Sequence, residues 1–122
     1  MVSKKEIKRV IKSYLRALES KNYNLIVKLF TADGVVESPL YGVVKAVDFY
    51  KDLFRDTKSS KITLYQIFKD GNVGSAFFRY DWELKDGSKF SFECVDIFYF
   101  TADGKIKKLK IIYDTSKVRR VS

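Results

Sequence analysis

Histidine is absent from this sequence of 122 residues, and cysteine and proline each occur once. Without histidine, the chain cannot form a zinc site of the cysteine–histidine type or a catalytic triad built on histidine. With a single cysteine it cannot form an intrachain disulfide, and no spacing of carboxylates predicts an oxygen-only cation site. We therefore expect neither a metal centre nor a cofactor.

Long apolar runs are also missing. No stretch approaches the roughly 18 apolar residues that a membrane-spanning helix needs. The first residues, MVSKKEIKRV, are charged and lack the apolar segment of a secretory signal. These two absences predict a cytoplasmic protein that does not enter a membrane.

The residues that are present have the composition of a folded domain. Hydrophobic residues make up 46% of the chain and aromatic residues 16%, which is too much for a disordered segment. A chain of this length can bury a core of its own. We therefore expect one domain over residues 1–122.

Positive charge exceeds negative charge, giving a formal net charge of +9. Basic residues gather at positions 4–9, 105–110 and 117–120. Such a balance suits nucleic acid or another anion. Because these lysines fall opposite the apolar positions of their elements, and no aromatic RNA-binding signature is present, we favour a solvated surface. Nucleic acid comes last among the partners that we expect.

Helical spacing governs the first part of the chain. Ser3 and Glu6 form a capping box, after which apolar residues recur every three or four positions to about Ser20. Asn22 can cap a second, short helix. A short strand is expected over residues 34–38, before Pro39, and a third helix from residue 42 to about 56. The apolar side of this third helix is predicted to carry Val43, Val47, Tyr50 and Phe54.

After residue 60 the apolar pattern changes to period two. Strands are predicted over residues 61–69, 73–84, 88–100 and 105–114, separated by turns that contain Asp and Gly. Helices followed by an antiparallel meander predict an α+β domain with the helices on one face of the sheet.

The central hairpin places one acid on the apolar face of the sheet. A three-residue loop at residues 85–87 pairs Trp82 with Phe90 and Ala76 with Asp96, so that the even-numbered apolar residues share a face. Asp96 then points towards the helices. Burial without a cationic partner raises the pKa of a carboxylic acid, and a neutral acid can donate a hydrogen bond. A structural acid, bonded to a backbone N–H or a tyrosine, is the alternative that the strand alone leaves open.

The segment SYLRALESKNYNLIVKLFTADGVVESP, residues 13–39, resembles the nuclear transport factor 2-like superfamily with its SnoaL-like members, and within it ketosteroid isomerase. The likeness spans about residues 5–114. It implies a cone-shaped fold in which three N-terminal helices pack on a curved, mixed or antiparallel β-sheet that encloses a pocket.

The resemblance also implies site residues. Tyr14 stands at the position of the oxyanion-hole tyrosine, and Asp96, in VDIFYF, at that of the protonated aspartic acid. Phe49 and Tyr50 match a Phe-Tyr pair whose tyrosine bonds to the oxyanion-hole tyrosine. In that enzyme an aspartate base works with this pair of donors. The resemblance therefore implies isomerase- or lyase-type chemistry on a carbonyl compound, and a small hydrophobic or aromatic ligand.

The base position departs from the family pattern. The residue before the matching proline is Ser38, where the isomerase has its aspartate. A serine without an activating partner is no base near neutral pH. We therefore take Tyr14, Asp96 and Ser38 as the candidate catalytic residues of a site whose base is missing. The expected pocket lining consists of Phe30, Val36, Phe49, Tyr50, Phe54, Phe78, Tyr80, Trp82, Phe92, Phe98, Leu109, Ile111 and Tyr113.

A non-catalytic, dimeric binding or adaptor protein is the alternative function. Members of this superfamily commonly dimerise through the outer face of the sheet. Alternation places Val95, Ile97 and Tyr99 on that face, where they would form an apolar patch. The expected partner in this case is a second copy of the chain.

Four further side chains are weaker candidates. Arg79 and Asp81 are similar to the Arg-x-Asp pair of limonene epoxide hydrolases, but the strand register turns them outward, as a surface ion pair. Asp114 matches an acid at the pocket rim of polyketide cyclases, and we expect it to cap a strand end. Cys94 has no visible activating neighbour and is predicted to be a small buried apolar residue.

Overall fold

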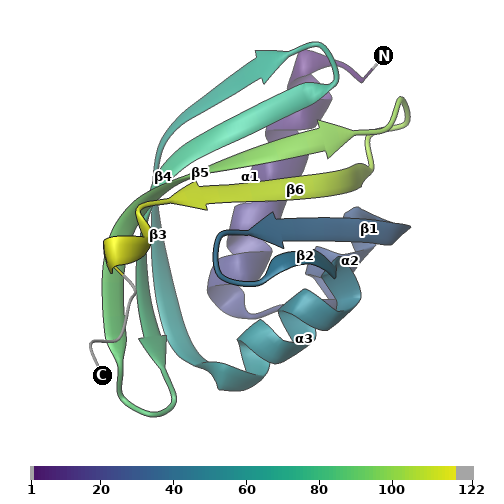
Figure 1. Ribbon diagram of the computed structural model, residues 1–122. Coiled ribbons are helices and arrows are strands. Elements are labelled where there is room, and N and C mark those ends of the chain that lie inside the picture. The colour runs from purple at the N-terminus through teal and green to yellow at the C-terminus, as the bar shows by residue number, and fades with distance from the viewer. Residues whose placement is uncertain (1, 118–122) are drawn as a thin grey trace.

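The computed structural model describes residues 2–117 and has an α+β fold, in which helices pack on the inner face of one curved sheet (Figure 1). This confirms the predicted fold class. No helix in the described range has the length and hydropathy needed to cross a membrane. The elements, in chain order, are α1 (Lys4–Ser20), α2 (Tyr23–Lys28), β1 (Phe30–Ser38), β2 (Gly42–Lys45), α3 (Ala46–Asp56), β3 (Thr57–Asp70), β4 (Val73–Leu84), β5 (Lys89–Phe100), β6 (Ile106–Tyr113) and a short 3-10 helix (Thr115–Lys117).

The first two helices begin at their predicted caps, and the first ends at Ser20 as predicted. The Ser3 side chain accepts a hydrogen bond from the Glu6 backbone N–H and caps α1, and the Asn22 side chain caps α2 through the Leu25 N–H. Lys21 ends α1 in the left-handed conformation, with φ of 57°. One face of α1, which includes Ile7, Ile11 and Tyr14, is buried against the sheet.

The sheet has six strands in the order β2-β1-β6-β5-β4-β3. Its central register confirms the predicted one, since Trp82 lies opposite Phe90 and Ala76 opposite Asp96. Arg79 and Asp81 face outward and form an exposed ion pair at 3.2 Å. The last four strands form the predicted antiparallel meander, and β1 pairs parallel with β6, so the sheet is mixed, which is one of the two forms that the resemblance implied. A parallel pairing needs a long connection between the two strands, and here one helix and four strands separate β1 from β6 in the chain.

The start of the predicted third helix is wrong. Residues 42–45 form β2, which pairs antiparallel with β1, and the helix begins only at Ala46. Gly42 has a φ of 68°, which a glycine adopts without strain and which turns the chain back along β1. Val43 and Val47, expected on the buried side, are exposed, whereas Tyr50 and Phe54 are buried as predicted. Val43 and Val44, which are neighbours in the chain, favour a strand here because β-branched residues are common in strands.

A close approach of α1 to the sheet depends on Gly74. A Cβ atom at this position of β4 would lie 2.6 Å from Cγ2 of Ile7 and 3.0 Å from Cδ1 of Ile11. A side chain at this position would force Ile7, Ile11 or the helix itself to move. Because glycine has no Cβ atom, Ile7 and Ile11 of α1 can pack directly against the backbone of β4 at Gly74.

Candidate functional site

Asp96 is buried in the interior of the cone. It lies on β5 between Ala76 of β4 and Ile111 of β6, and is 2% exposed. Its Oδ1 atom makes no hydrogen bond with any described residue. Burial alone raises the pKa of Asp96 from its ordinary value of 3.8 to about 8. At neutral pH the acid is therefore mostly protonated and can donate a hydrogen bond.

Two tyrosines from different helices meet next to this acid. The hydroxyl groups of Tyr14, on α1, and Tyr50, on α3, lie 2.5 Å apart, and both side chains are buried. Burial raises the pKa of both hydroxyls well above 10, and the neighbouring Tyr50 and Asp96 raise that of Tyr14 further. Both hydroxyls therefore keep their protons at physiological pH and act as hydrogen-bond donors.

Aromatic rings surround this cluster. The ring of Tyr14 packs edge-on against Phe98 at 5.1 Å and against Phe30 at 6.3 Å between ring centroids. Tyr80 is also buried, its pKa is raised by burial, and Asp96 contributes to that rise. We call Tyr14, Tyr50, Tyr80 and Asp96 the acid–tyrosine cluster. It is a set of protonated oxygen groups in apolar surroundings.

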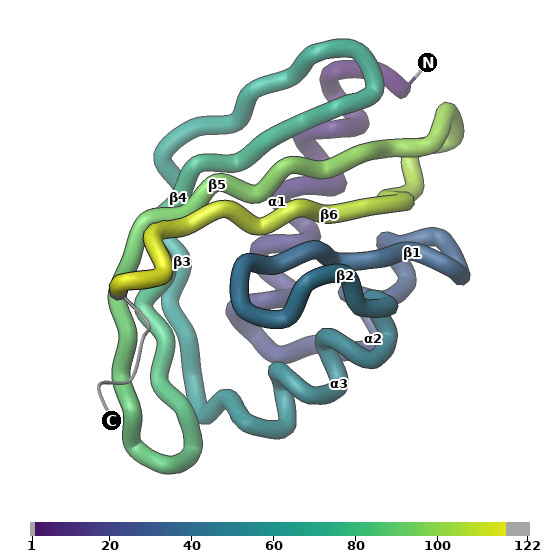
Figure 2. Tube along the Cα trace, viewed as in Figure 1, coloured from purple at the N-terminus to yellow at the C-terminus, as the bar shows by residue number. Residues whose placement is uncertain are grey.

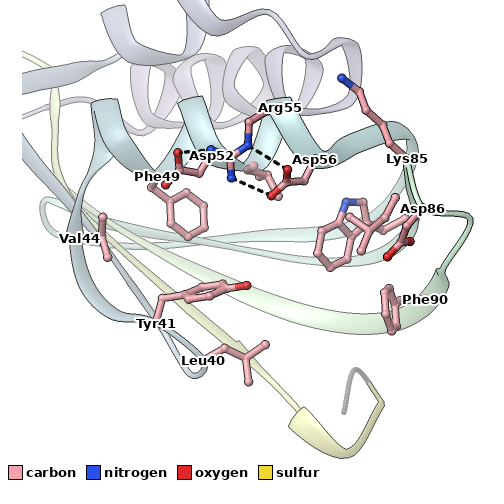
Figure 3. A pocket seen from close by; sticks show the side chains of 13 residues that line it. Leu40, Tyr41, Val44, Phe49, Asp52, Arg55, Asp56, Lys85, Asp86 and Phe90 are labelled. Atoms are coloured by element: carbon pink, nitrogen blue, oxygen red, sulfur yellow. Dashed lines mark hydrogen bonds and ion pairs between the residues drawn. The ribbon is translucent and has the colours of Figure 1, made fainter. Parts of the chain in front are cut away.

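An open pocket with a volume of about 720 Å³ lies at the wide end of the cone. Three parts of the chain form it: helix α3, the turn between β1 and β2, and the β4–β5 hairpin (Figure 3). Figure 3 shows Phe49 projecting from α3 towards Tyr41 of the turn, with Phe90 on the opposite wall. The lining residues are Leu40, Tyr41, Val44, Phe49, Asp52, Leu53, Arg55, Asp56, Trp82, Leu84, Lys85, Asp86 and Phe90.

Charged residues occupy one rim of this pocket. The Arg55 guanidinium bonds to both carboxylate oxygens of Asp56, at 2.9 and 3.1 Å, and lies 3.3 Å from a carboxylate oxygen of Asp52. The hydrogen bond from Arg55 lowers the pKa of Asp56, which makes this carboxylate a weaker base. The rim therefore carries paired charges above walls that are mainly apolar.

Two of the residues predicted to line a pocket reach this one, namely Phe49 and Trp82. The others pack in the core or at its margin: Phe30, Val36, Tyr50, Phe54, Phe78, Tyr80, Phe98 and Leu109 are buried, and Phe92, Ile111 and Tyr113 are partly buried. Tyr14, Asp96 and Ser38 do not line the pocket either. Their roles stay predictions.

Ring contacts connect the pocket wall with the acid–tyrosine cluster. Phe49 packs edge-on against Tyr50 at 5.0 Å, and Trp82 lies 5.9 Å from Tyr80, measured between ring centroids. The Trp82 indole N–H is held by Thr57 Oγ1 at 2.9 Å. The cluster therefore lies one aromatic layer behind the wall of the pocket.

Ser38 holds the turn that borders the pocket. It is 7% exposed, and its hydroxyl accepts a hydrogen bond from the Tyr41 N–H at 3.3 Å. The neighbouring Glu37 faces the other side of the sheet, where Lys108 and Lys110 lie 3.1 and 3.7 Å from its carboxylate. Neither residue supplies a base to the acid–tyrosine cluster.

The surroundings of Cys94 and Asp114, two of the weaker candidates, indicate structural roles. Cys94 is buried, and burial raises the pKa of its thiol, so it stays protonated. Asp114 accepts a hydrogen bond from the Ser116 N–H at 3.0 Å, as expected for a cap at the end of a strand. Over residues 2–117, no group of three or more acidic or cysteine side chains is arranged to hold a metal ion.

The sequence did not predict that the rim residues and the β1–β2 turn would line a pocket. Leu40, Tyr41, Phe90 and the Asp52–Arg55–Asp56 group come from segments far apart in the chain. The only signal was the presence of apolar residues next to turn residues, which is common at surfaces. Their convergence depends on how the β4–β5 hairpin bends over α3, where the Lys85 N–H bonds to the Asp56 carbonyl at 2.9 Å.

Comparisons with known proteins agree with this architecture. One similar structure is an epoxide hydrolase/cyclase-like enzyme with a role in pyran ring formation in the polyether salinomycin, 18% identical over 96% of this chain and 97% of the other, with a TM-score of 0.83. Another is a putative hydroxylase from Streptomyces galilaeus, 15% identical over 95% and 94%, with a TM-score of 0.79. A third is an epoxide hydrolase of the LEH-like type from M. tuberculosis, 16% identical over 93% and 86%, with a TM-score of 0.77.

At these levels of identity the likeness to solved structures shows the fold alone. No curated protein matches the sequence. The SnoaL-like domain, in contrast, matches residues 11–109, which is most of the chain. The protein therefore belongs to the SnoaL-like domain family.

Proposed function

We propose that this protein binds a small apolar or aromatic molecule in the pocket at the wide end of the cone, and that the acid–tyrosine cluster donates hydrogen bonds to a carbonyl or phenolic oxygen of that molecule. The observation that carries the proposal is the Oδ1 atom of Asp96, which is buried, lacks a hydrogen-bond partner and belongs to a mostly neutral acid. Buried polar groups are normally paired, so an unpaired one suggests a place for a ligand atom.

The dimensions and walls of the pocket support this proposal. Its volume of about 720 Å³ falls within the usual range of small-molecule sites. Phe49, Trp82 and Phe90 present ring faces and edges, which favour a flat, apolar ligand. The ligand oxygen reaches Asp96 only if the aromatic layer between pocket and cluster turns aside, so the proposal includes a rotation of Phe49 or Trp82.

The resemblance to ketosteroid isomerase extends the proposal to catalysis. A base would remove a proton next to the carbonyl of the substrate, and the electron pair of the broken C–H bond would move onto the oxygen. Tyr14 and Asp96 would stabilise the resulting enolate, and return of the proton at another carbon would complete an isomerisation. The base would be water or a carboxylate of the pocket rim. Neighbouring folds that carry enzymes, including the epoxide hydrolase/cyclase-like one, support small-molecule chemistry of this kind.

Tryptophan fluorescence can test whether the ligand binds in this pocket, because Trp82 is the only tryptophan and lines it. Titration with substituted naphthols near pH 7 is expected to change the emission of the wild-type protein in a saturable way. Phe90→Asp should abolish saturable binding, because it places a charge on the apolar wall. Phe68→Asp, which changes an exposed phenylalanine on another surface, is the matched control and should bind as the wild type does. Equal binding by both variants would contradict the assignment of the pocket.

A dimeric, non-catalytic binding protein is the second candidate function. It is favoured by the outer face of the sheet, where Val95 pairs with Ile112, which is 44% exposed, and Ile97 lies two residues further along β5. On this proposal two copies pack outer face to outer face. Sedimentation equilibrium should then give the mass of a dimer for the wild type and that of a monomer for Ile97→Lys. A monomeric wild type would remove this candidate.

A further inference from the structure

A second groove runs between α1 and the edge strand β3, away from the pocket described above. Its larger part has a volume of about 400 Å³ and is lined by Lys4, Ile7, Lys8 and Lys12 of the helix and by residues 64–69 of the strand. A smaller hollow of about 210 Å³ continues it and shares Lys12 and Leu64. Figure 2 shows the first part of α1 beside the β3–β4 turn. The Val2 N–H bonds to the Asn72 side chain there, at 3.1 Å.

The helix side of this groove is a row of positively charged side chains that form no ion pair among the described residues. Lys4, Lys8, Lys12 and Arg16 follow one another at intervals of four residues, so they lie along one face of α1, and all are exposed. We call these four residues the basic row. Glu6 lies two residues from both Lys4 and Lys8, on a different side of the helix, and is paired with Arg9.

The strand side of the groove is an unpaired sheet edge. Strand β3 is the last in the sheet order and pairs only with β4. This edge strand of 14 residues presents backbone N–H and C=O groups to whatever lies beside it, in a row that is interrupted by a register irregularity between Leu64 and Gln66. At one position the chain itself supplies a partner, since a carboxylate oxygen of Glu19 accepts a hydrogen bond from the Ile62 N–H at 2.7 Å. An acidic group from α1 therefore already occupies the edge at the far end of the groove.

The spacing of the charges fits an extended peptide. Residues four apart on a helix are separated by about 6 Å along its axis, and alternate residues of a strand by about 6.6 Å. Acidic side chains at every second position of a strand beside β3 would thus meet successive members of the basic row. The other side chains of that strand would point to the outer face, where Tyr65 and Phe68 are 45% and 50% exposed. Tyr65 and Phe68 belong to that face, because Tyr65 packs on Phe77 and Phe68 pairs with Ser75.

We infer that this groove binds an acidic, extended polypeptide segment, which adds as a strand to the β3 edge with Asp or Glu at alternate positions facing the basic row and apolar residues between them. The phosphates of a nucleic acid would bind the positive charges of the basic row. They would not form the series of backbone hydrogen bonds that a second polypeptide strand forms with the β3 edge. The site is independent of the pocket and of the acid–tyrosine cluster.

The probe is a fluorescein-labelled peptide of about eight residues with alternating Glu and Val, measured by fluorescence anisotropy with the full chain. We expect saturable binding that weakens about tenfold or more in the variant Lys8→Glu with Lys12→Glu, because both charges face the peptide. The matched control, Lys51→Glu with Lys107→Glu, makes the same change of net charge at exposed positions outside the groove and should bind as the wild type does. Circular dichroism checks that both variants fold.

Two N-methylated forms of the peptide separate strand pairing from simple charge attraction. Alternate N–H groups of a strand point to opposite edges. Methylation of one set should therefore abolish binding, whereas methylation of the other set should leave it unchanged. Equal binding of both forms, equal binding of the groove and control variants, or no binding of the unmethylated peptide would each overturn the inference. A single-stranded oligonucleotide that competes with the peptide at equal concentration would also overturn it, in favour of general anion binding.

Discussion

Asp96 makes the stability of the protein depend on pH, because its pKa in the folded state differs from that in the unfolded chain. The folded pKa is raised to about 8, whereas an unfolded aspartic acid titrates near 3.9. Below about pH 4 both states hold the proton, and the acid contributes no pH dependence. Between the two pKa values only the folded state holds it, so the unfolded state is favoured increasingly as the pH rises.

The variant Asp96→Asn should reveal this cost. The free energy of unfolding of the wild type is expected to fall, relative to that of the variant, by about 1.4 kcal/mol for each pH unit between about pH 4 and pH 8. Urea denaturation of both proteins at several pH values measures it. The constant difference due to the buried amide cancels from the comparison. A difference that does not change with pH would mean that Asp96 is ionised in the folded protein.

The hydroxyls of Tyr14 and Tyr50 form a pair that should behave as one unit. Tyr14→Phe leaves the Tyr50 hydroxyl buried without its partner, at a cost of about 1–3 kcal/mol, and Tyr50→Phe does the same for Tyr14. The double variant removes both groups and should be less destabilised than the sum of the single variants. Denaturation of all four proteins completes the cycle, and additive costs would show that the two hydroxyls do not depend on each other.

For single residues, the sequence predicted the strand position and direction of a side chain better than it predicted the residues that surround that side chain. Period-two alternation and the Asp86-Gly87 turn determine the register, and with it the inward direction of Asp96. The residues around Asp96 come from helices and other strands, so the lack of a hydrogen-bond partner for its Oδ1 atom could not be foreseen from the strand alone. Likewise, the rim residues of the pocket carry no local signal, because only the closed fold brings Arg55 near Phe90.

At the scale of elements, Gly74 determines how α1 fits the sheet. Gly74→Ala should lower the free energy of unfolding by about 1–3 kcal/mol, because its Cβ would overlap Ile7 and crowd Ile11. Thermal and urea denaturation measure the loss, and Ser75→Ala on the outer face of the same strand is the control. In a background with Ile7→Ala the added cost of Gly74→Ala should shrink, since the overlapping methyl group is gone. An unchanged stability of Gly74→Ala would show that the helix can shift freely.

The elements with strong periodicity were predictable, whereas the shortest strand was not. Helix α1 and strands β4 and β5 agree with the sequence patterns almost to the residue. Strand β2 was merged with α3, because four residues are too few to show a period and its pairing with β1 is not local. The parallel contact of β1 with β6 joins segments about seventy residues apart in the chain, which no local pattern encodes.

At the scale of the whole molecule, the cone has two distinct surfaces where a partner could bind. The pocket lies between α3 and the β4–β5 hairpin, and the basic groove lies between α1 and β3 (Figure 1). The pocket is lined by aromatic residues and lies one ring layer from neutral oxygen donors, whereas the groove is cationic and borders an open strand edge. These differences are why we propose a small apolar ligand for the pocket and an acidic peptide for the groove.

The central claim is that the neutral acid Asp96 donates a hydrogen bond to the oxygen of a ligand in the pocket. Its most direct test is the affinity of a series of naphthols of graded acidity, measured near pH 7 through Trp82 emission with the wild type and with Asp96→Asn. We predict that the wild-type affinity changes steadily with naphthol acidity, and that the variant binds about tenfold or more weakly with a flatter dependence. Equal affinities and equal dependence in the two folded proteins would contradict the claim and leave Asp96 as a structural acid.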